Sequence, residues 1–542
     1  MASSHSDDRE KGLSSPAKLA SGAPLEATVS YNHNPSAGGK EEQVLSSLGY
    51  ESELRRNLSL WTVLGLGAAI IAAPFGLSTS ASFALTNGGR TSYVWGWVLL
   101  SLISLALAAS LGEICSVYPT SGGVYVWTAH LAPRRSAKIS SFVVGWISVV
   151  ANLTLCLSIA FGEAQLIMAA ISVFRNDEWA PEAWHIILTF WAIMALCALI
   201  NAWGVRAKLL EPINTLSIYW TLASAVIICI VVLVMSDDRR SAREVFAQWQ
   251  NASGWSDGWS FFVGLLTPAY VLTGYGTISY LCEEVKQPEV AVPRAMLGSV
   301  IAASFTGFLF LIPMSFVFPA DLSLILEATA GQPIPVALSR ATRSAGGGFG
   351  LLFLILGVGM FASVGSLTVA LRSVWAFSRD GGLPLSSIWK KVDRVHQLPL
   401  NSLIITTVII SLLGLIYLGA SAAFNAFTGS CTILLGLSYV YPVACSLAGG
   451  RRLVKHASWS LGRFGYLINI IALIWVVFSV VLFCFPTTAQ VDAAGMNYAS
   501  VVVVFFAAFA ALYYVVWARR SYTGPSLATE GHKEEDTAAG GW

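Results

Sequence analysis

Twelve long stretches of predominantly apolar residues follow one another along the chain, separated by short polar segments. Each stretch has about 20 residues or more, which is enough for an α-helix to cross the hydrocarbon core of a bilayer. The pattern therefore predicts an all-α membrane protein with twelve transmembrane helices, at residues 60–85, 92–117, 139–172, 184–203, 211–235, 260–282, 297–318, 349–377, 399–419, 423–448, 464–486 and 498–518.

Two of these stretches carry residues that interrupt helices. The first contains Gly65, Gly67, Pro74 and Gly76, and the sixth contains Pro268, Gly274 and Gly276. Backbone groups freed by a break at membrane depth must face protein or a water-filled cavity, because lipid offers them no hydrogen bonds. Secondary transporters use such broken helices to build substrate and ion sites. We therefore expect a binding site between the first and sixth helices.

The two interrupted helices lie five spans apart. An odd spacing reverses the direction in which a helix crosses the membrane, so the two halves would be related by an axis in the membrane plane. The sequence thus predicts a five-plus-five inverted repeat followed by two accessory helices. The expected boundaries are 46–520 for the transporter domain, 59–236 and 260–448 for the repeats, and 464–518 for the accessory helices.

Both ends of the chain are polar. Residues 1–45 lack any apolar run, which is typical of a disordered tail and not of a signal peptide. Residues 521–542 form a second short tail. Loops on the side of the tails are richer in Lys and Arg than the loops on the other side, and basic loops are retained in the cytoplasm. Both termini are therefore expected to be cytoplasmic.

Composition supports the membrane assignment. Of 542 residues, 55% are hydrophobic and only 11% are charged, and the mean hydropathy is +0.66. Soluble proteins have about twice that charged fraction. The net charge of +2, without a dense basic run, gives no sign of nucleic-acid binding. The eight cysteines show no metal-ligand spacing and no disulfide framework, so we expect neither a metal nor another cofactor.

The break in the first helix, residues 68–76, consists mostly of small apolar residues. Side chains of this kind leave recognition to the backbone. The amides at the start of the second half-helix suit a carboxylate, because a helix N-terminus carries partial positive charge. The candidate substrate-binding residues here are Ala68, Ala69, Ala72 and Ala73.

In the sixth helix, Tyr270 lies about one turn before the break. An aromatic ring at that place can close over a bound ligand and can make a cation–π contact with an amine, worth about 0.5–2 kcal/mol. The alternative is that Tyr270 belongs to an interfacial aromatic belt. The break itself contributes the candidates Thr273, Gly274, Tyr275, Gly276 and Thr277.

Polar residues inside other apolar stretches are further candidates. Burying the charge of Glu163, in the third helix, would cost about 2.5–3.5 kcal/mol. Glu163 is therefore expected to pair with a cationic substrate or to carry a coupling proton. The alternative is that its side chain reaches the outer membrane interface. Asn152 either binds substrate or bonds to a neighbouring helix. Ser363 and Ser366, in the eighth helix, either line the cavity or bond back to their own helix.

Charged residues mark three loops on the tail side. Glu113 begins a segment rich in Pro, Gly and aromatic residues that ends at Pro133. We expect this segment to form a gate at the cytoplasmic mouth of the transporter. Glu283 and Glu284 end the sixth helix, whereas Arg372 and Arg379 end the eighth. These opposite charges are candidates for a lock that opens and closes, although exposed pairs are worth only about 0–1 kcal/mol each. For Arg372 the alternative is that its side chain extends to the membrane surface.

Residues 113–133, 283–294 and 372–384 together resemble the amino acid/choline transporter family, which includes GABA permeases, within the amino acid–polyamine–organocation superfamily. The resemblance spans about 45–520. It implies a LeuT-like twelve-helix fold, a substrate site between the breaks of helices one and six, and coupling that is usually to protons. Substrates of the family include GABA, other amino acids, choline and polyamines.

The chain departs from this family at two places. Many relatives carry an acidic residue where this sequence has Gly276, and relatives often carry Ser where it has Leu371. A carboxylate that would face a substrate amine, or carry a proton, is therefore missing at position 276. This departure makes Glu163 a candidate for the replacement charge.

The leading hypothesis is a proton-coupled, secondary active permease for amino acids or related amines such as GABA, working by alternating access. Two alternatives remain open: a transporter of choline, polyamine or another organic cation, and a nutrient sensor that does not transport. An enzyme is not expected, because no nucleophile–base pair, metal cluster or phosphate loop is found. The plasma membrane is the expected location, with a vacuolar or other organelle membrane as the alternative.

Overall fold

The computed structural model describes residues 37–50, 53–54, 56–176, 178–206, 209–393, 398–419, 423–455, 457–491 and 496–525. Residues 1–36 and 526–542, which make up most of the two predicted tails, lie outside this part of the chain.

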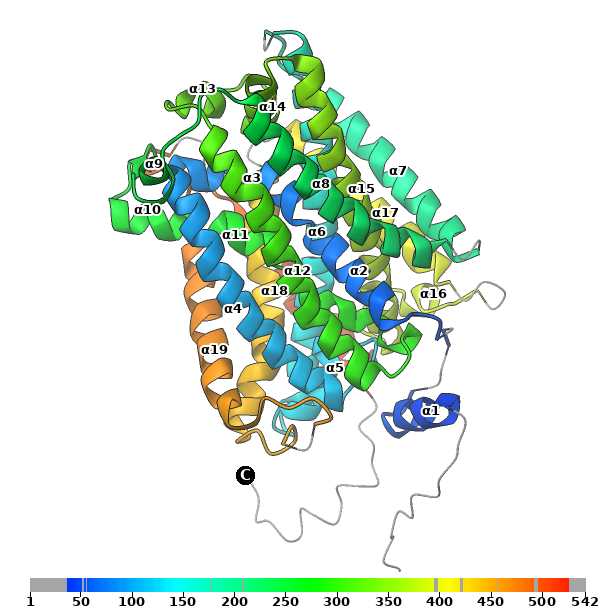
Figure 1. Ribbon diagram of the computed structural model, residues 1–542. Coiled ribbons are helices and arrows are strands. Elements are labelled where there is room, and N and C mark those ends of the chain that lie inside the picture. The colour runs from blue at the N-terminus through cyan, green and yellow to red at the C-terminus, as the bar shows by residue number, and fades with distance from the viewer. Residues whose placement is uncertain are drawn as a thin grey trace, which may run out of the picture.

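The structure is a bundle of long helices (Figure 1). Twelve helices in the described part are long and apolar enough to cross a membrane, which confirms the prediction of an all-α, twelve-span protein. The first and sixth of these spans are described below. The other ten are α4 (Gly89–Val117), α6 (Ala137–Phe174), α7 (Ala183–Arg206), α8 (Leu210–Met235), α12 (Pro288–Val317), α15 (Ala345–Arg379), α17 (Leu400–Gly414) with η2 (Leu415–Leu418), α18 (Ala423–Ala448), α19 (Gly465–Leu482), and α20 (Ala499–Tyr513) with η4 (Tyr514–Ala518) and α21 (Arg519–Ser521).

Short elements connect the spans. The helical ones are α1 (Ala37–Ser47), α5 (Val124–Leu131), α9 (Ala242–Phe246), α13 (Ser323–Leu326), α14 (Pro333–Thr342), α16 (Ser386–Trp389) and η3 (Gly462–Phe464). Two short strands, β1 (Asn87–Gly88) and β2 (Gln250–Asn251), pair in antiparallel fashion. This pairing joins the loop after the first span to the loop before the sixth.

The first span is broken, as predicted. It consists of α2 (Leu60–Ile71) and α3 (Ala73–Thr86), separated at Ala72, whose φ of 44° is left-handed. Pro74 lies in the first turn of α3, where its missing amide costs the helix nothing. A left-handed residue followed by this proline ends α2 and starts α3 in a new direction.

Gly65 and Gly67, which the sequence reading counted as breakers, lie inside α2. A Cβ at Gly65 would come within 2.5 Å of the Asn214 carbonyl oxygen, and one at Gly67 would meet the Ile278 side chain at the same distance. These glycines therefore allow other helices to pack closely against α2 without interrupting it.

The sixth span is broken as well. It consists of α10 (Asp257–Gly264), α11 (Leu266–Val271) and the 3₁₀-helix η1 (Tyr275–Glu284). Gly274, with a φ of 85°, takes up the left-handed conformation at the break, which a side chain would strain. A ten-residue 3₁₀-helix is unusually long, and such stretches often mark hinges.

Burial separates central from peripheral helices. The two broken spans and α6 are mostly buried inside the protein, whereas α8, α17 and α20 are mostly exposed at the periphery. The central helix α6 packs against α18 and α15, and α4 packs against α12. The broken helices thus lie where protein rather than lipid surrounds their free backbone groups.

The bundle has two ends, which we call the terminal end and the far end. The terminal end carries α1 and α5, in the lower part of Figure 1, and α9, α10 and α13 lie toward the far end. Helix α1 begins at Ala37, inside the segment expected to be a tail up to residue 45. Leu45, Leu48 and Tyr50 are buried, so this stretch packs on the protein.

Candidate functional site

The two breaks face each other in the middle of the bundle. A Cβ at Gly274 would come within 3.0 Å of Ile70, and one at Gly76 would come within 2.9 Å of Val271. Thr267 in α11 adds a polar link, because its hydroxyl donates to the Ser80 carbonyl at 2.6 Å. The glycines therefore permit the two broken spans to lie in direct contact.

A small cavity of about 10 Å³ lies between the breaks. Its walls come from both broken spans and from α6: Ile70, Ile71, Ala72, Phe75, Gly76, Leu155, Ile159, Tyr270, Val271 and Thr273. This volume accommodates about one water molecule. The cavity must therefore enlarge before it can admit an amino acid or an amine.

The backbone supplies both signs of partial charge at this point. The C-terminal carbonyls of α2 and the N-terminal amides of α3 meet at Ala72, and helix ends carry partial negative and positive charge, respectively. Ala73 and Phe75 are in the first turn of α3, where the helix itself offers their amides no acceptor. A zwitterion can be bound here without any charged side chain.

Of the four alanines predicted for this break, Ala72 lines the cavity. The Ala68 carbonyl accepts a hydrogen bond from the Ala72 amide at 2.9 Å, which closes the last turn of α2. Ala69 and Ala73 are buried. These three residues shape the break and do not form the cavity wall.

Tyr270 is 4% exposed and lines the cavity, with its hydroxyl donating to the Ser158 hydroxyl at 3.1 Å. The ring therefore belongs to the centre of the bundle and not to an aromatic belt at a membrane interface. Its bond to α6 ties the sixth span to a central helix.

The other residues of the sixth break take different positions. Thr273 lines both the central cavity and a second one of about 30 Å³, which Tyr275 also lines. The Thr277 hydroxyl donates to the Gly274 carbonyl at 2.5 Å, so it satisfies the freed backbone of the break. The break thus combines cavity-lining and capping residues.

Gly276 has Tyr439 of α18 directly beside it. A Cβ at this glycine would lie 2.7 Å from the Tyr439 ring and 2.9 Å from Leu111. The rings of Tyr439 and Tyr275 are 5.5 Å apart. An acidic side chain at position 276 would therefore clash with Tyr439, which explains physically why the chain has glycine there.

Glu163 is 1% exposed, and its carboxylate accepts a hydrogen bond from the Ser363 hydroxyl at 2.8 Å. It lies one helical turn beyond Ile159, which lines the central cavity. The side chain is thus buried between α6 and α15 and does not reach a membrane interface. A buried carboxyl group of this kind is a strong candidate for proton binding.

Two further candidates bond within their own helices. The Asn152 amide donates to the Ser148 carbonyl at 2.7 Å, and the Ser366 hydroxyl donates to the Ser363 carbonyl at 3.1 Å. The Asn152 side-chain oxygen is buried and has no hydrogen-bond partner among the described residues. Neither Asn152 nor Ser366 lines the central cavity.

At the terminal end, the charges that close the sixth and eighth spans form two ion pairs. Arg379 binds Glu283 through two hydrogen bonds of 2.9 Å each, and Arg372 binds Glu284 in the same bidentate manner, with one contact at 2.9 Å. The Ser121 amide also donates to Glu283, at 3.2 Å. The three predicted loops thus meet here, and Arg372 turns inward to Glu284.

Asp380 organises a second contact beside these pairs. Its carboxylate accepts hydrogen bonds from the hydroxyls of Tyr50 at 2.9 Å and Tyr125 at 2.8 Å. The Arg379 guanidinium lies over the Tyr50 ring, 4.2 Å from its centre. Burial raises the pKa of Asp380, although Arg379 and the two hydroxyls act to lower it. Burial also raises the pKa of Tyr50, which therefore remains a donor.

Glu113 lies apart from this cluster. Its carboxylate binds Arg451 at 2.6 and 2.8 Å and accepts hydrogen bonds from the Ser460 hydroxyl and the Leu461 amide. Glu113 therefore joins α4 to the loop between α18 and α19. Its lone pairs are well satisfied, as is typical of a structural carboxylate.

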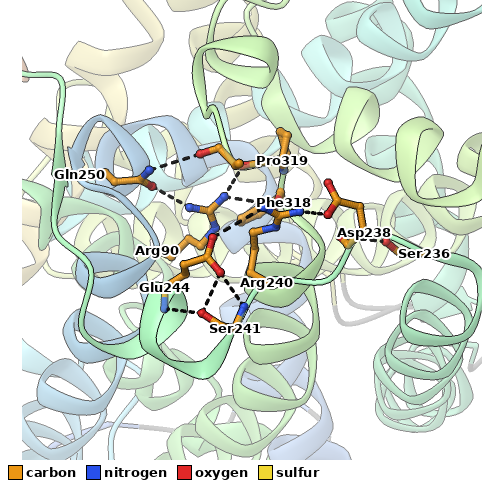
Figure 2. Close-up of polar contacts among 10 residues, drawn as sticks. Arg90, Ser236, Asp238, Arg240, Ser241, Glu244, Gln250, Phe318 and Pro319 are labelled. Atoms are coloured by element: carbon orange, nitrogen blue, oxygen red, sulfur yellow. Dashed lines mark hydrogen bonds and ion pairs between the residues drawn. The ribbon is translucent and has the colours of Figure 1, made fainter.

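At the far end, Arg90 of α4 lies within a shell of acceptors (Figure 2). It donates to the Gln250 side chain at 2.6 Å and to the Phe318 carbonyl at 3.2 Å, and it also contacts the Pro319 carbonyl. The neighbouring Arg240 amide donates to the Phe316 carbonyl at 2.8 Å. These bonds hold the loops around α9 and β2 to the end of α12.

Several residues of the central cavity and of the charged cluster at the terminal end were not predicted from the sequence. Phe75, Leu155 and Ile159 line the cavity, but apolar side chains in apolar helices give no signal that separates them from lipid-facing ones. Asp380 was inside a segment that was singled out, and its place beside Arg379 was the available signal. Tyr50 and Tyr439 had no local signal, because their contacts join distant parts of the chain.

Comparison with known proteins now adds to this geometry. The sequence model of a family described as amino acid permease matches residues 58–507, which is most of the chain. The chain belongs to the amino acid permease family. This membership agrees with the predicted transporter class and with the expectation that the chain is not an enzyme.

Relatives of this permease carry several substrate names. It is 34% identical to the choline transporter of Saccharomyces cerevisiae, over 86% of this chain and 82% of the relative. It is 31% identical to the polyamine transporter TPO5 of the same yeast, over 90% and 79% of the two chains. It is 29% identical to the amino-acid permease BAT1 of Arabidopsis thaliana, over 89% and 95%.

Proposed function

We propose that this permease is a secondary active transporter of an amino acid or a related small amine, working by alternating access. The observation that carries the proposal is the contact between two broken spans around a central cavity, in a member of a permease family. The proposed architecture is a LeuT-like inverted repeat, with repeats at 59–236 and 260–448 inside a transporter domain of 46–520.

In the proposed binding mode, the backbone recognises the charged groups. The substrate carboxylate, or another electron-rich end, binds the amides at the start of α3, and the ammonium faces the carbonyl ends of α2. The remainder of the substrate lies under the Tyr270 ring, near Thr273. This mode suits GABA and other amino acids.

An organic cation such as choline or a polyamine is the second candidate. It is favoured by the names of two relatives and by the aromatic rings at the sixth break. Tyr270 lines the central cavity, and Tyr275 and Tyr439 line the adjacent one. Aromatic rings bind quaternary ammonium groups through cation–π contacts.

The structure supports a transport cycle with an occluded state. The central cavity holds about one water molecule, and polar contacts close both ends of the bundle. Opening of the terminal end would separate α15 from η1 and break the ion pairs of Arg372 and Arg379. We place this end in the cytoplasm, which puts both termini there, and we place the protein in the plasma membrane.

Proton coupling is proposed to act through Glu163. Its carboxyl group is buried beside the central cavity with a serine hydroxyl as its partner, so that gaining or losing a proton would alter its contact with α15. Glu113 is the weaker candidate, since Arg451 already neutralises its charge.

A competition screen in proteoliposomes tests the proposed function. Uptake of radiolabelled GABA, other amino acids, choline and polyamines would be measured with and without an inward proton gradient. We expect one of these classes to accumulate and the gradient to increase its uptake. Binding of a substrate without any uptake would support the nutrient-sensor alternative and would overturn the proposal.

A further inference from the structure

A long apolar groove runs along the outside of the bundle, away from the central cavity. It has a volume of about 370 Å³ and is lined by α6, α18, α20 and η4, including Phe142, Trp146, Leu434, Phe506 and Val515. Its edge residues Ile139 and Val515 are 50% and 71% exposed. The groove is therefore open to the bilayer, and its walls are almost entirely apolar.

One end of the groove lies at the terminal end of the bundle. Ile139 belongs to the first turn of α6, and Val515 lies one turn before α21. Two contacts hold the start of α6 against the end of the last span. The ring centres of Phe142 and Tyr514 are 4.9 Å apart, and the Ser141 and Tyr522 hydroxyls are 3.0 Å apart. The start of α6 and the end of the last span thus form a common rim.

This rim carries basic residues. Arg135 and Lys138 precede the groove on the α6 side, and Arg519 and Arg520 follow it on the α21 side, all four with exposed side chains. Residues 133–150, 423–448 and 499–525, which include every wall of the groove, contain no Asp or Glu. The positive charge of the rim is therefore not neutralised by its own segments.

We propose that this groove and its rim form a binding site for an anionic phospholipid of the leaflet at the terminal end. An acyl chain fills the apolar groove, while the phosphate and the acidic headgroup bind Arg135, Lys138, Arg519 and Arg520. Basic side chains at the surface of an anionic leaflet attract such lipids, roughly fivefold in affinity for each cation. The groove adds a fixed position for the chain, which surface charge alone does not give.

The site is separate from the substrate cavity and does not depend on which substrate is transported. Phe142 and Trp146 lie on α6, whose opposite face reaches the central cavity through Leu155 and Ile159. A lipid held here would thus brace the last span against a central helix. Lipid binding is measured without any transport assay, so its failure and that of the proposed function can be told apart.

Native mass spectrometry of the purified full-length chain tests the proposal. The protein would be mixed with equal amounts of phosphatidylserine and phosphatidylcholine that have identical acyl chains. We expect the wild type to retain phosphatidylserine preferentially. The variant R135Q/K138Q/R519Q/R520Q should lose this preference, by roughly fivefold for each cation removed.

A matched variant controls for net charge. K286Q/R294Q/K390Q/K391Q removes four exposed cations from other parts of the terminal end and should leave the preference unchanged. A preference that is absent in the wild type, or that falls equally in both quadruple variants, would overturn the proposal.

The groove is tested separately with a bulky residue. Ala511 lies in the groove wall and is exposed, so Ala511→Trp should fill the groove without disturbing the protein core, and it should lower retention of phosphatidylserine. Leu467→Trp places the same ring on an exposed position of α19 and should have no effect. Equal retention by both tryptophan variants would contradict the role of the groove.

Discussion

Tyr439, which is distant in the sequence, limits which residue can occupy position 276. The ring of Tyr439 occupies the space that a side chain at position 276 would need. A residue larger than glycine therefore has no room at position 276 while Tyr439 keeps this place. The sequence of the sixth helix alone shows that position 276 has no carboxylate, but not that Tyr439 fills the neighbouring space.

Gly276→Ala should lower thermal stability in detergent, by about 1–3 kcal/mol, because the new methyl group overpacks against Tyr439. Combining it with Tyr439→Ala should cost less than the sum of the two single changes, because the clash is removed. Strictly additive effects in this double-mutant cycle would show that the two positions do not share space.

Tyr270→Ala should raise the substrate concentration needed for half-maximal uptake by about 2- to 30-fold, the range of a lost cation–π contact. Tyr270→Phe keeps the ring and removes only the hydrogen bond to Ser158, so its effect should be small. Uptake kinetics in proteoliposomes measure both. An unchanged half-saturation value for Tyr270→Ala would exclude the residue from the site.

Glu163→Gln tests the coupling residue. Glutamine preserves a hydrogen-bond acceptor for Ser363 but cannot take up or release a proton, so uptake should lose its response to an imposed pH gradient. Ser363→Ala serves as the control, since it removes the hydrogen bond and keeps the carboxyl group. Should Glu163→Gln retain the full gradient response, another group must carry the proton.

Among the helices, the breaks in the first and sixth spans could be predicted from the sequence, but the packing of the helices against one another could not. The breaks contain Pro74, in the first turn of α3, and Gly274, in a left-handed conformation, so the interrupted spans could be predicted from these residues. Gly65 and Gly67 look the same in the sequence but lie within a continuous helix, because their role is close packing against α8 and η1. Only the tertiary structure separates these two uses of glycine.

The ion pairs between η1 and α15 give a second test at this scale. Arg379→Ala leaves Glu283 buried without its cation and should destabilise the protein by about 3–5 kcal/mol. The exchanged pair Arg379→Glu/Glu283→Arg should recover part of this loss and part of uptake. Thermal denaturation and uptake would be measured on the same preparations. If the exchange rescues neither, the pair does not act as a unit.

For the whole molecule, the number of spans was predictable because bilayer thickness fixes the length of an apolar helix. The contact between the breaks of the first and sixth spans, where we propose the site, followed from the residues that interrupt these helices. The detailed walls of the cavity did not, since Phe75, Leu155 and Ile159 are ordinary apolar residues until the fold brings them together. The contact of Tyr50 with Asp380 likewise joins segments 330 residues apart.

We interpret the structure as the occluded state of the proposed transport cycle. In the proposed mechanism, the cavity of about 10 Å³ between helix ends of opposite partial charge is the substrate site before it opens. The ion pairs at the terminal end and the acceptors around Arg90 at the far end hold this state. In the proposed mechanism, a bound substrate therefore lies between the two breaks.

Protection of Thr273 from a thiol reagent tests this position of the substrate most directly. Thr273→Cys would be introduced into a transport-competent protein whose own cysteines have been replaced, and its labelling would be timed with and without saturating substrate. The account predicts that the transported substrate slows labelling strongly, whereas a non-transported analogue does not. Equal labelling rates in a variant that still takes up substrate would contradict it.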